Sequence, residues 1–341
     1  MRERTLLRKL VELAQYGALR GAFALLHSFS VDQGMDTAAG LGSVLYRCSG
    51  RHRRRACTQI SRAFPGMSAI EVSRLAERSM QSMLQLFMIE TVAAPRLIGP
   101  RTWTNRVEMG ELGAALRIAI ADRPALFLTG HCGNWELLGS ALALLGFPMT
   151  ALARPLDNPW LDGWIRSVRE ARGLRILTKF GATGEVQKVI EAGGRVAFIA
   201  DQNAGDDGLF VPFFGTLASS YKSIGLLAMR HNLPIVVGAT RRLDGQFRHS
   251  LCAVDVIEPA DWEAQDDPLF YITARFNRGI ETAIRRAPEQ YLWIHRRWKS
   301  RPPWERKGEP MPERYRRRLE ALPWMTHEEL ERCSQPMPAL A

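Results

Sequence analysis

Apolar positions in the first hundred residues recur with the spacing of a helix. After the capping-box pattern Ser68-Ala69-Ile70-Glu71, apolar side chains follow every three or four residues from Val72 to Met88. This periodicity predicts an amphipathic helix whose apolar face packs on the core. Together with the apolar N-terminal stretch, it predicts that residues 1–95 form a helical region.

The N-terminal stretch itself places charge before apolar residues, as an interfacial helix does. Glu12, Arg20 and His27 interrupt the apolar run, which falls short of the roughly 18 uninterrupted apolar residues that a spanning helix needs. We therefore expect peripheral or monotopic attachment to a membrane surface, with basic flanking residues near the head groups.

From about residue 100 the pattern changes to short apolar runs separated by helical stretches. The runs are 125–129, 150–153, 196–200 and 235–239, and the helical stretches between them include 137–145, 159–172 and 183–192. Such alternation predicts an α/β fold: a mixed, mostly parallel central sheet flanked by helices. We assign residues 96–305 to one catalytic domain and the proline-, arginine- and glutamate-rich residues 306–341 to an extended C-terminal tail.

Charge is concentrated at two places along the chain. Residues 1–55 carry ten basic against four acidic side chains and residues 295–318 carry ten against three, whereas the net charge of the whole chain is +11. The body between them is nearly neutral, so the basic segments, including Arg51–Arg55 and Arg314–Arg318, are expected to meet anionic lipid or an acidic protein. Five cysteines without a CxxC pair indicate a reducing compartment.

The strongest chemical signal follows the first buried run. Gly130 ends that run, and His131 stands before a predicted helix, at the sheet edge where open α/β proteins bind ligands. An imidazole there can serve as a general base, with Glu136 as the carboxylate that orients it. Asp201 ends the run 196–200 at the same edge and is the alternative partner.

Several further residues are candidates for substrate binding. Backbone N–H groups near Gly133 and Asn134 could bind an oxyanion or a phosphate, and Arg154 could clamp a phosphate, unless it forms a surface salt bridge. The segment with Phe213, Gly215 and Ser219 is expected to shape an acyl or acceptor pocket, although its aromatic residues would also suit an ordinary core.

Other site types lack their motifs. The chain has no HExxH zinc motif, no GxSxG elbow, no GxGxxG and no P-loop, so neither a metal nor a cofactor is expected. Cys132 is interpreted as a packing residue, and the remaining histidines, His295 among them, are assigned structural or solvent-exposed roles.

Five sequence blocks together resemble the bacterial lipid A biosynthesis acyltransferases, the lauroyl and myristoyl transferases of the H-x4-D/E glycerolipid acyltransferase superfamily. The blocks run in order over about residues 100–305: His131–Glu136 as HCGNWE, Ala153–Pro159, Ala200–Asn203, Phe210–Gly215 with Ser219, and Glu289–Trp298. Gln202 becomes a candidate substrate-binding residue because it lies in the third block. The interrupted N-terminal stretch departs from the clearer membrane segment often found in this family.

The resemblance implies transfer of a fatty acyl chain from acyl carrier protein to a hydroxyl of a lipid A precursor, at the cytoplasmic face of the inner membrane. His131 would deprotonate the hydroxyl and Glu136 would complete the H-x4-E motif, without metal, cofactor or covalent acyl-enzyme. Membrane lipids are expected partners and nucleic acid is not. The alternatives are another glycolipid or lysophospholipid acceptor such as a phosphatidylinositol mannoside, a coenzyme A donor, or a non-enzymatic basic protein that binds membrane or nucleic acid.

Overall fold

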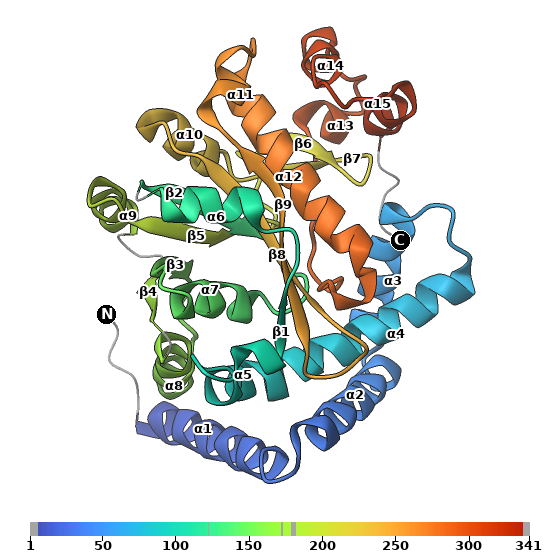
Figure 1. The fold of residues 1–341 in the computed structure, drawn as a ribbon. Helices are drawn as coiled ribbons and strands as arrows, with labels where there is room; N and C mark the ends of the chain where they lie inside the picture. The colour runs from blue at the N-terminus through green and yellow to red at the C-terminus, as the bar shows by residue number, and fades with distance from the viewer. Residues whose placement is uncertain (1–5, 122, 172, 179–181, 337–341) are drawn as a thin grey trace.

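The computed structural model describes residues 6–336 apart from 122, 172 and 179–181 (Figure 1). Its centre is a seven-stranded sheet in the order β1-β9-β8-β2-β5-β3-β4. The strands are β1 (Val107–Met109), β2 (Ala125–Thr129), β3 (Met149–Ala153), β4 (Leu174–Thr178), β5 (Arg195–Ile199), β8 (Ile235–Arg242) and β9 (His249–Ile257). Every neighbouring pair is parallel except β8 and β9. The prediction of a mixed, mostly parallel sheet is confirmed.

Helices cover both faces of this sheet. The flanking helices are α6 (Gly113–Ile120), α7 (Trp135–Leu144), α8 (Pro159–Glu170), α9 (Ala182–Glu191), α10 (Lys222–His231), α11 (Pro259–Glu263) and α12 (Pro268–Arg286). Two neighbouring residues of β8 contact different helices. A methyl group added at Gly238 would lie 3.3 Å from Leu138 of α7. The side chain of Val237 lies 3.1 Å from the position of a methyl group added at Gly279 of α12. Because successive strand residues point to opposite faces, α7 and α12 lie on opposite sides of the sheet.

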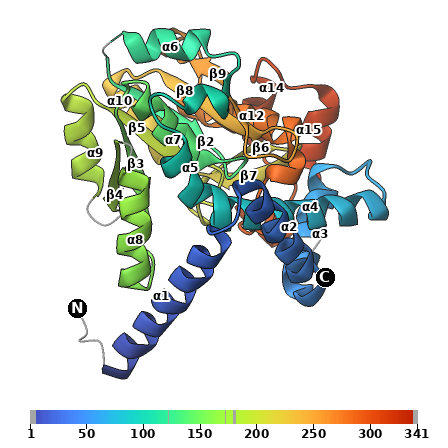
Figure 2. The same ribbon diagram turned by 60° about the horizontal axis from the view of Figure 1, so that its bottom comes forward.

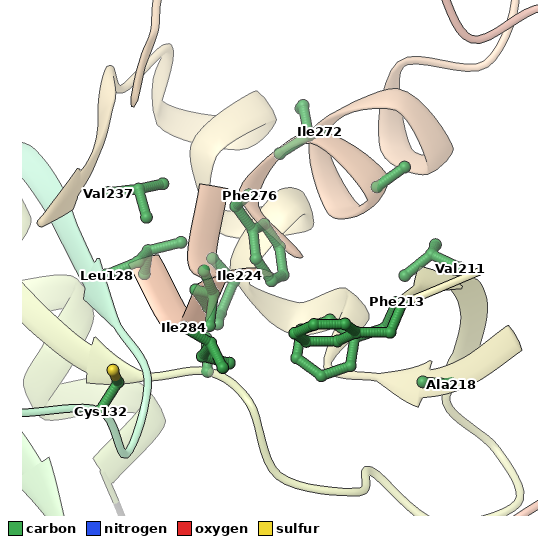
Figure 3. Packing of buried hydrophobic residues seen from close by; sticks show 14 of the residues in the cluster. Leu128, Cys132, Val211, Phe213, Ala218, Ile224, Val237, Ile272, Phe276 and Ile284 are labelled. Carbon is green, nitrogen blue, oxygen red and sulfur yellow. The ribbon is translucent and has the colours of Figure 1, made fainter. Parts of the chain in front are cut away.

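Strand β2 shows why a continuous apolar run forms a central strand. All five of its residues are buried. Leu126 and Leu128 join the cluster that includes Phe276 of α12, and Ala125 and Phe127 join the cluster on the other face. Side chains on both faces of β2 are therefore apolar, as in other parallel strands that helices cover on both sides. Figure 3 shows Leu128 and Val237 of the sheet facing Phe276 and Ile284 of α12.

The N-terminal region is helical, as predicted. It comprises α1 (Leu6–Leu26), α2 (Val31–Cys48), α3 (Gly50–Ala63), α4 (Ala69–Gln85), a π-helical turn η1 (Leu86–Glu90) and α5 (Thr91–Leu97). Ser68 and Glu71 form the capping box expected from the sequence. None of the helices in the described ranges has the length and apolar content needed to cross a bilayer. Figure 2 shows α1 leading away from the body of the molecule.

The C-terminal segment is folded, so the prediction of an extended tail is wrong for the residues described, which end at 336. It forms α13 (Pro303–Lys307), α14 (Glu313–Glu320) and α15 (His327–Ser334). Leu319 and Leu330 are buried in the main core, and the Tyr315 hydroxyl donates a hydrogen bond to the Phe210 carbonyl of the small hairpin β6 (Leu209–Phe213) and β7 (Thr216–Ser220). The proline and arginine content had concealed short amphipathic helices.

Candidate active site

His131 lies just beyond the carboxyl end of β2, at the edge of the sheet. Thr129 of β2 is in register with Ile199 of the neighbouring parallel strand β5. Residues two positions further along each chain, His131 and Asp201, therefore emerge side by side. Gly130 leaves room for the Asp201 side chain, since an added methyl group would lie 2.7 Å from the Ile280 side chain and 3.3 Å from a carboxylate oxygen of Asp201.

The side chains of His131 and Asp201 form a tight pair. The Nδ1 atom of His131 lies 2.7 Å from Oδ1 of Asp201, and the backbone N–H of His131 donates to Oδ2 at 2.8 Å. Burial alone would raise the pKa of Asp201, but the charge and the hydrogen bonds of His131 outweigh it and hold that pKa below its ordinary value. An ionised Asp201 can only accept, so the Nδ1 atom of His131 carries a proton, and in the neutral imidazole Nε2 is then the nitrogen with the lone pair.

Two rings flank the imidazole of His131. Trp135 meets it edge-on with centroids 4.9 Å apart, and His295 lies tilted against it at 4.7 Å. Burial, with the nearby charge of His131 and a smaller effect of Arg55, lowers the pKa of His295 to about 4, against an opposing effect of Asp201. His295 is therefore a neutral ring at neutral pH, and the His131 side chain keeps 12% of its surface exposed.

The turn that carries His131 is held by the loop after α12. Leu292 N–H donates to the His131 carbonyl at 3.0 Å, and Gly133 N–H donates to the Gln290 carbonyl at 3.0 Å. Gly133 has φ of +61°, and an added methyl group would lie 1.8 Å from the Thr240 carbonyl oxygen. Only glycine fits here, but because its N–H is already bonded, Gly133 does not offer the oxyanion donor that the sequence suggested.

Asn134 has a structural contact as well. Its Oδ1 accepts the backbone N–H of Leu137 at 2.8 Å, which makes it the N-cap of α7. The helix thus begins directly beside His131. The candidate donors to an oxyanion are then the N–H groups of the first turn of α7, which have no acceptor within a helix.

Glu136 does not contact His131, contrary to the first expectation from the sequence. It pairs instead with Arg169 of α8, with Nη2 to Oε1 at 2.5 Å and Nε to Oε2 at 2.9 Å. The physical reason is helical geometry: Glu136 is the second residue of α7, so its side chain projects from the helix toward α8 and not back over the strand end. The alternative partner that the sequence left open, Asp201, occupies that position.

An apolar cavity opens beside this ion pair. The space between its lining atoms is about 900 Å³, and part of that volume is open solvent. Trp135, Glu136 and Arg169 contribute to its lining near the catalytic edge. The rest is mainly aliphatic, and representative lining residues are Phe127, Leu138, Leu142, Leu152, Leu174 and Val236. The cavity therefore extends between α7 and the face of the sheet.

The structure does not bring the remaining predicted binding residues to this site. Arg154 is largely exposed and lies 3.8 Å from Asp157, the surface ion pair that was the alternative. Gln202 is also exposed, and its carbonyl lies 3.5 Å from Arg297.

Phe213, Gly215 and Ser219 belong to the hairpin and its core, and none of the three lines the apolar cavity. Phe213 is fully buried beneath the Arg297 guanidinium. Gly215 sits in the β6–β7 turn with φ of +66°, and the Ser219 hydroxyl donates to the Gly205 carbonyl at 2.5 Å.

Cys132 is buried against the carbonyl groups of Ala283 and Ala287. Burial, with a smaller effect of the nearby Asp201 charge, raises the pKa of its thiol well above the ordinary value. The thiol therefore stays protonated at neutral pH and is not a nucleophile.

Three residues at the site are not predicted from the sequence. The sequence favours a structural or solvent-exposed role for His295, although this residue lies in the block Glu289–Trp298. Tyr291 of the same block is buried close to Asp201, and burial with that charge raises its pKa well above 10. Arg169 gave no signal, because only the packing of α7 against α8 shows that it meets Glu136.

Comparison with known proteins matches most of the chain to one family. Residues 9–300 match the family model described as bacterial lipid A biosynthesis acyltransferase. A Shigella flexneri protein named lipid A biosynthesis acyltransferase 2 is 26% identical over 264 residues, covering 77% of this chain and 82% of that protein.

Two proteins of Escherichia coli strain K12 are similar to the same extent. The lipid A biosynthesis myristoyltransferase is 27% identical over 274 residues, covering 78% of this chain and 81% of its own length. The lipid A biosynthesis lauroyltransferase is 26% identical over 283 residues, covering 81% and 86%. These matches confirm the resemblance carried by the five sequence blocks.

Proposed function

Because the chain belongs to the bacterial lipid A biosynthesis acyltransferase family, we propose that it transfers a fatty acyl chain from acyl carrier protein to a hydroxyl of a lipid A precursor, as a late acylation step. The observation that carries this proposal is the pairing of His131 with Asp201 beside an apolar cavity. A base and an apolar binding site are what transfer of an acyl chain to an unactivated hydroxyl requires.

In the proposed reaction, His131 acts as the general base. Its Nε2 takes the proton of the acceptor hydroxyl while the hydroxyl oxygen attacks the thioester carbonyl carbon. Asp201 keeps the proton on Nδ1 and stabilises the imidazolium that forms. The tetrahedral intermediate then collapses to the ester, the carbon–sulfur bond breaks, and the carrier's thiolate takes the proton from Nε2.

The acyl chain of the donor occupies the apolar cavity in this proposal. The cavity lining is aliphatic and aromatic apart from a few polar groups, among them Glu136 and Arg169. Burying a methylene group stabilises the bound chain by roughly 0.8 kcal/mol. With its tail below α7, the thioester carbonyl would lie near the N-terminus of that helix, where first-turn N–H groups favour negative charge on the oxyanion.

Glu136 has a positioning role in this scheme and is not the partner of His131. Its ion pair with Arg169 joins α7 to α8 at the wall of the cavity, with both side chains less than a third exposed. The pair therefore fixes the helix that begins beside His131.

The membrane is the source of the acceptor, and we propose that α1 attaches the enzyme to the cytoplasmic face of the inner membrane. Leu6, Leu7 and Leu10 are exposed on α1, by 74%, 73% and 56%. Trp160 at the start of α8 is exposed by 51% and lies against Tyr16 of α1. Exposed apolar side chains of this number suit an interfacial helix.

The test is transfer of labelled lauroyl or myristoyl groups from acyl carrier protein to a tetra-acylated lipid A precursor by the detergent-solubilised protein. We expect His131→Ala and Asp201→Asn each to lower kcat by about 10²–10⁴, the usual contribution of a general base, while Cys132→Ala retains activity. Equal rates for wild type and His131→Ala would overturn the assignment of the base. Absence of transfer by the wild type with every donor and acceptor tried would overturn the function.

A further inference from the structure

Two basic segments without acidic residues meet next to His131. Residues 47–62, which span most of α3, contain six arginines and no acid, and residues 296–301 contain four basic side chains and no acid. The segments are joined by a hydrogen bond of 3.3 Å from Arg55 Nη1 to the carbonyl of Ile294. Arg297 is buried and Arg301 pairs with Glu305, so the exposed charge of the second segment comes from Arg296 and Lys299. Together with the arginines of α3 these side chains are called the cationic surface.

Three arginines of this surface lie close to one another. Arg51 and Arg55 are four residues apart on α3 and share one face of the helix, and Arg296 is two residues beyond Ile294, which Arg55 contacts. Burial, together with repulsion by Arg296 and Arg51, lowers the pKa of Arg55. Within the described ranges none of the three forms an ion pair with a carboxylate, so their combined charge has no counterpart in the protein.

The position of these arginines connects them to the reaction. Ile294 immediately precedes His295, whose ring lies 4.7 Å from that of His131. The other ring neighbour of His131, Trp135, lines the apolar cavity. The imidazole is thus contacted by one residue of the apolar cavity and by one residue of the basic segment.

We infer that Arg51, Arg55 and Arg296 bind a phosphate group carried by the acceptor lipid and thereby place its hydroxyl at His131, an inference that rests on the proposed function. Guanidinium groups form paired, charge-assisted hydrogen bonds with phosphate oxygens. The phosphate and the reacting hydroxyl belong to the same acceptor molecule. Binding of the phosphate at these arginines therefore places the hydroxyl oxygen at His131.

The compactness of the cluster favours a substrate phosphate over an acidic carrier protein. A stable protein partner covers about 800 Å² on each side and does not need cations next to the imidazole. Arg55 is half-buried and anchored to the Ile294 carbonyl, which suits a small anion held at a defined place.

The test compares the wild type with Arg51→Gln/Arg296→Gln, which changes two exposed side chains and keeps the Arg55 anchor. The acceptors are the tetra-acylated lipid A precursor and the same precursor after its phosphates are removed. We expect the double variant to raise KM for the phosphorylated acceptor about tenfold, since charge-assisted hydrogen bonds are lost. Its kcat, its KM for the carrier-bound donor and its kinetics with the dephosphorylated acceptor should stay within twofold.

The matched control is Arg314→Gln/Arg317→Gln on α14, which removes the same charge and should leave every constant within twofold. If the double variant raises only KM for acyl carrier protein, the arginines bind the carrier and the inference is overturned. If none of its kinetic constants changes, the inference is overturned as well. Binding of the two acceptors, measured by microscale thermophoresis, gives a readout without turnover. If the wild type transfers nothing, the proposed function fails. If the wild type binds the phosphorylated and the dephosphorylated acceptor equally well, only the inferred phosphate site fails.

Discussion

At the scale of single residues, His295 makes the stability of the fold depend on pH. Burial and the neighbouring charge of His131 lower its pKa from 6.5 to about 4, while in the unfolded chain the imidazole binds a proton near pH 6.5. Between these values the unfolded state binds more protons than the folded state, so stability falls as the pH falls. We expect acidification from pH 7 to 4.5 to lower the free energy of unfolding by about 2–3 kcal/mol through this group.

Denaturant unfolding of the detergent-solubilised protein at both pH values measures this effect. His295→Gln should lose that part of the pH dependence, whereas His327→Gln, which changes an exposed histidine at the start of α15, should retain it. An equal decrease in wild type and His295→Gln would show that His295 is not held neutral in the folded protein.

The sequence placed His131 and Asp201 correctly at strand ends but could not choose the partner of His131. Both residues follow buried apolar runs, which indicated the same sheet edge. That β2 and β5 are neighbours follows from the strand order, in which β3 and β4 lie beyond β5 although they come earlier in the chain. Proximity in sequence therefore favoured Glu136, while the register Thr129–Ile199 brings Asp201 to the imidazole.

At the scale of elements, α7 forms one wall of the cavity in which we propose that the acyl chain binds. Gly139 of this helix lines the cavity, and an added methyl group would lie 3.2 Å from Leu174 on the opposite wall. We expect Gly139→Leu to fill space equal to about two methylene groups and to shift the kcat/KM ratio of ten-carbon over fourteen-carbon donors upward about tenfold, at roughly 0.8 kcal/mol per methylene.

Competition between the two labelled donors measures that ratio directly. Gly163→Leu on α8 is the matched control, because an added methyl group there meets nothing within 4 Å, and it should leave the ratio unchanged. If Gly139→Leu slows both donors equally, the cavity does not hold the acyl chain.

Elements with strong periodicity were predicted from the sequence, and short elements were not. The amphipathic helix after Ser68 and the buried run of β2 were recognised because their pattern repeats over many residues or is uniformly apolar. Helices α13 to α15 have at most eight residues each, too few to show a period among prolines and arginines. They are stabilised by tertiary packing of residues such as Leu319 and Leu330, which sequence alone does not show.

At the scale of the whole molecule, the position of α1 relative to the body supports the proposed attachment of this helix to a membrane. Phe23 near the end of α1 is buried against Trp164 of α8, with ring centroids 4.9 Å apart. The beginning of α1 leads outward with its leucines exposed (Figure 2). One end of the helix is thus fixed to the catalytic domain, and the other is available to a bilayer.

This arrangement predicts that Leu7→Glu/Leu10→Glu weakens vesicle binding without unfolding the protein, since both side chains are exposed. Each leucine lost from the interface removes about 1.5–3 kcal/mol, so we expect the two substitutions to lower partitioning to vesicles with anionic lipid at least about a hundredfold. Ile70→Glu/Ile120→Glu changes two equally exposed side chains on α4 and α6 and should sediment with vesicles like the wild type. Sodium carbonate should release the wild type from membranes. Its retention in the pellet, or unchanged binding of the α1 variant, would mean that another segment provides the attachment.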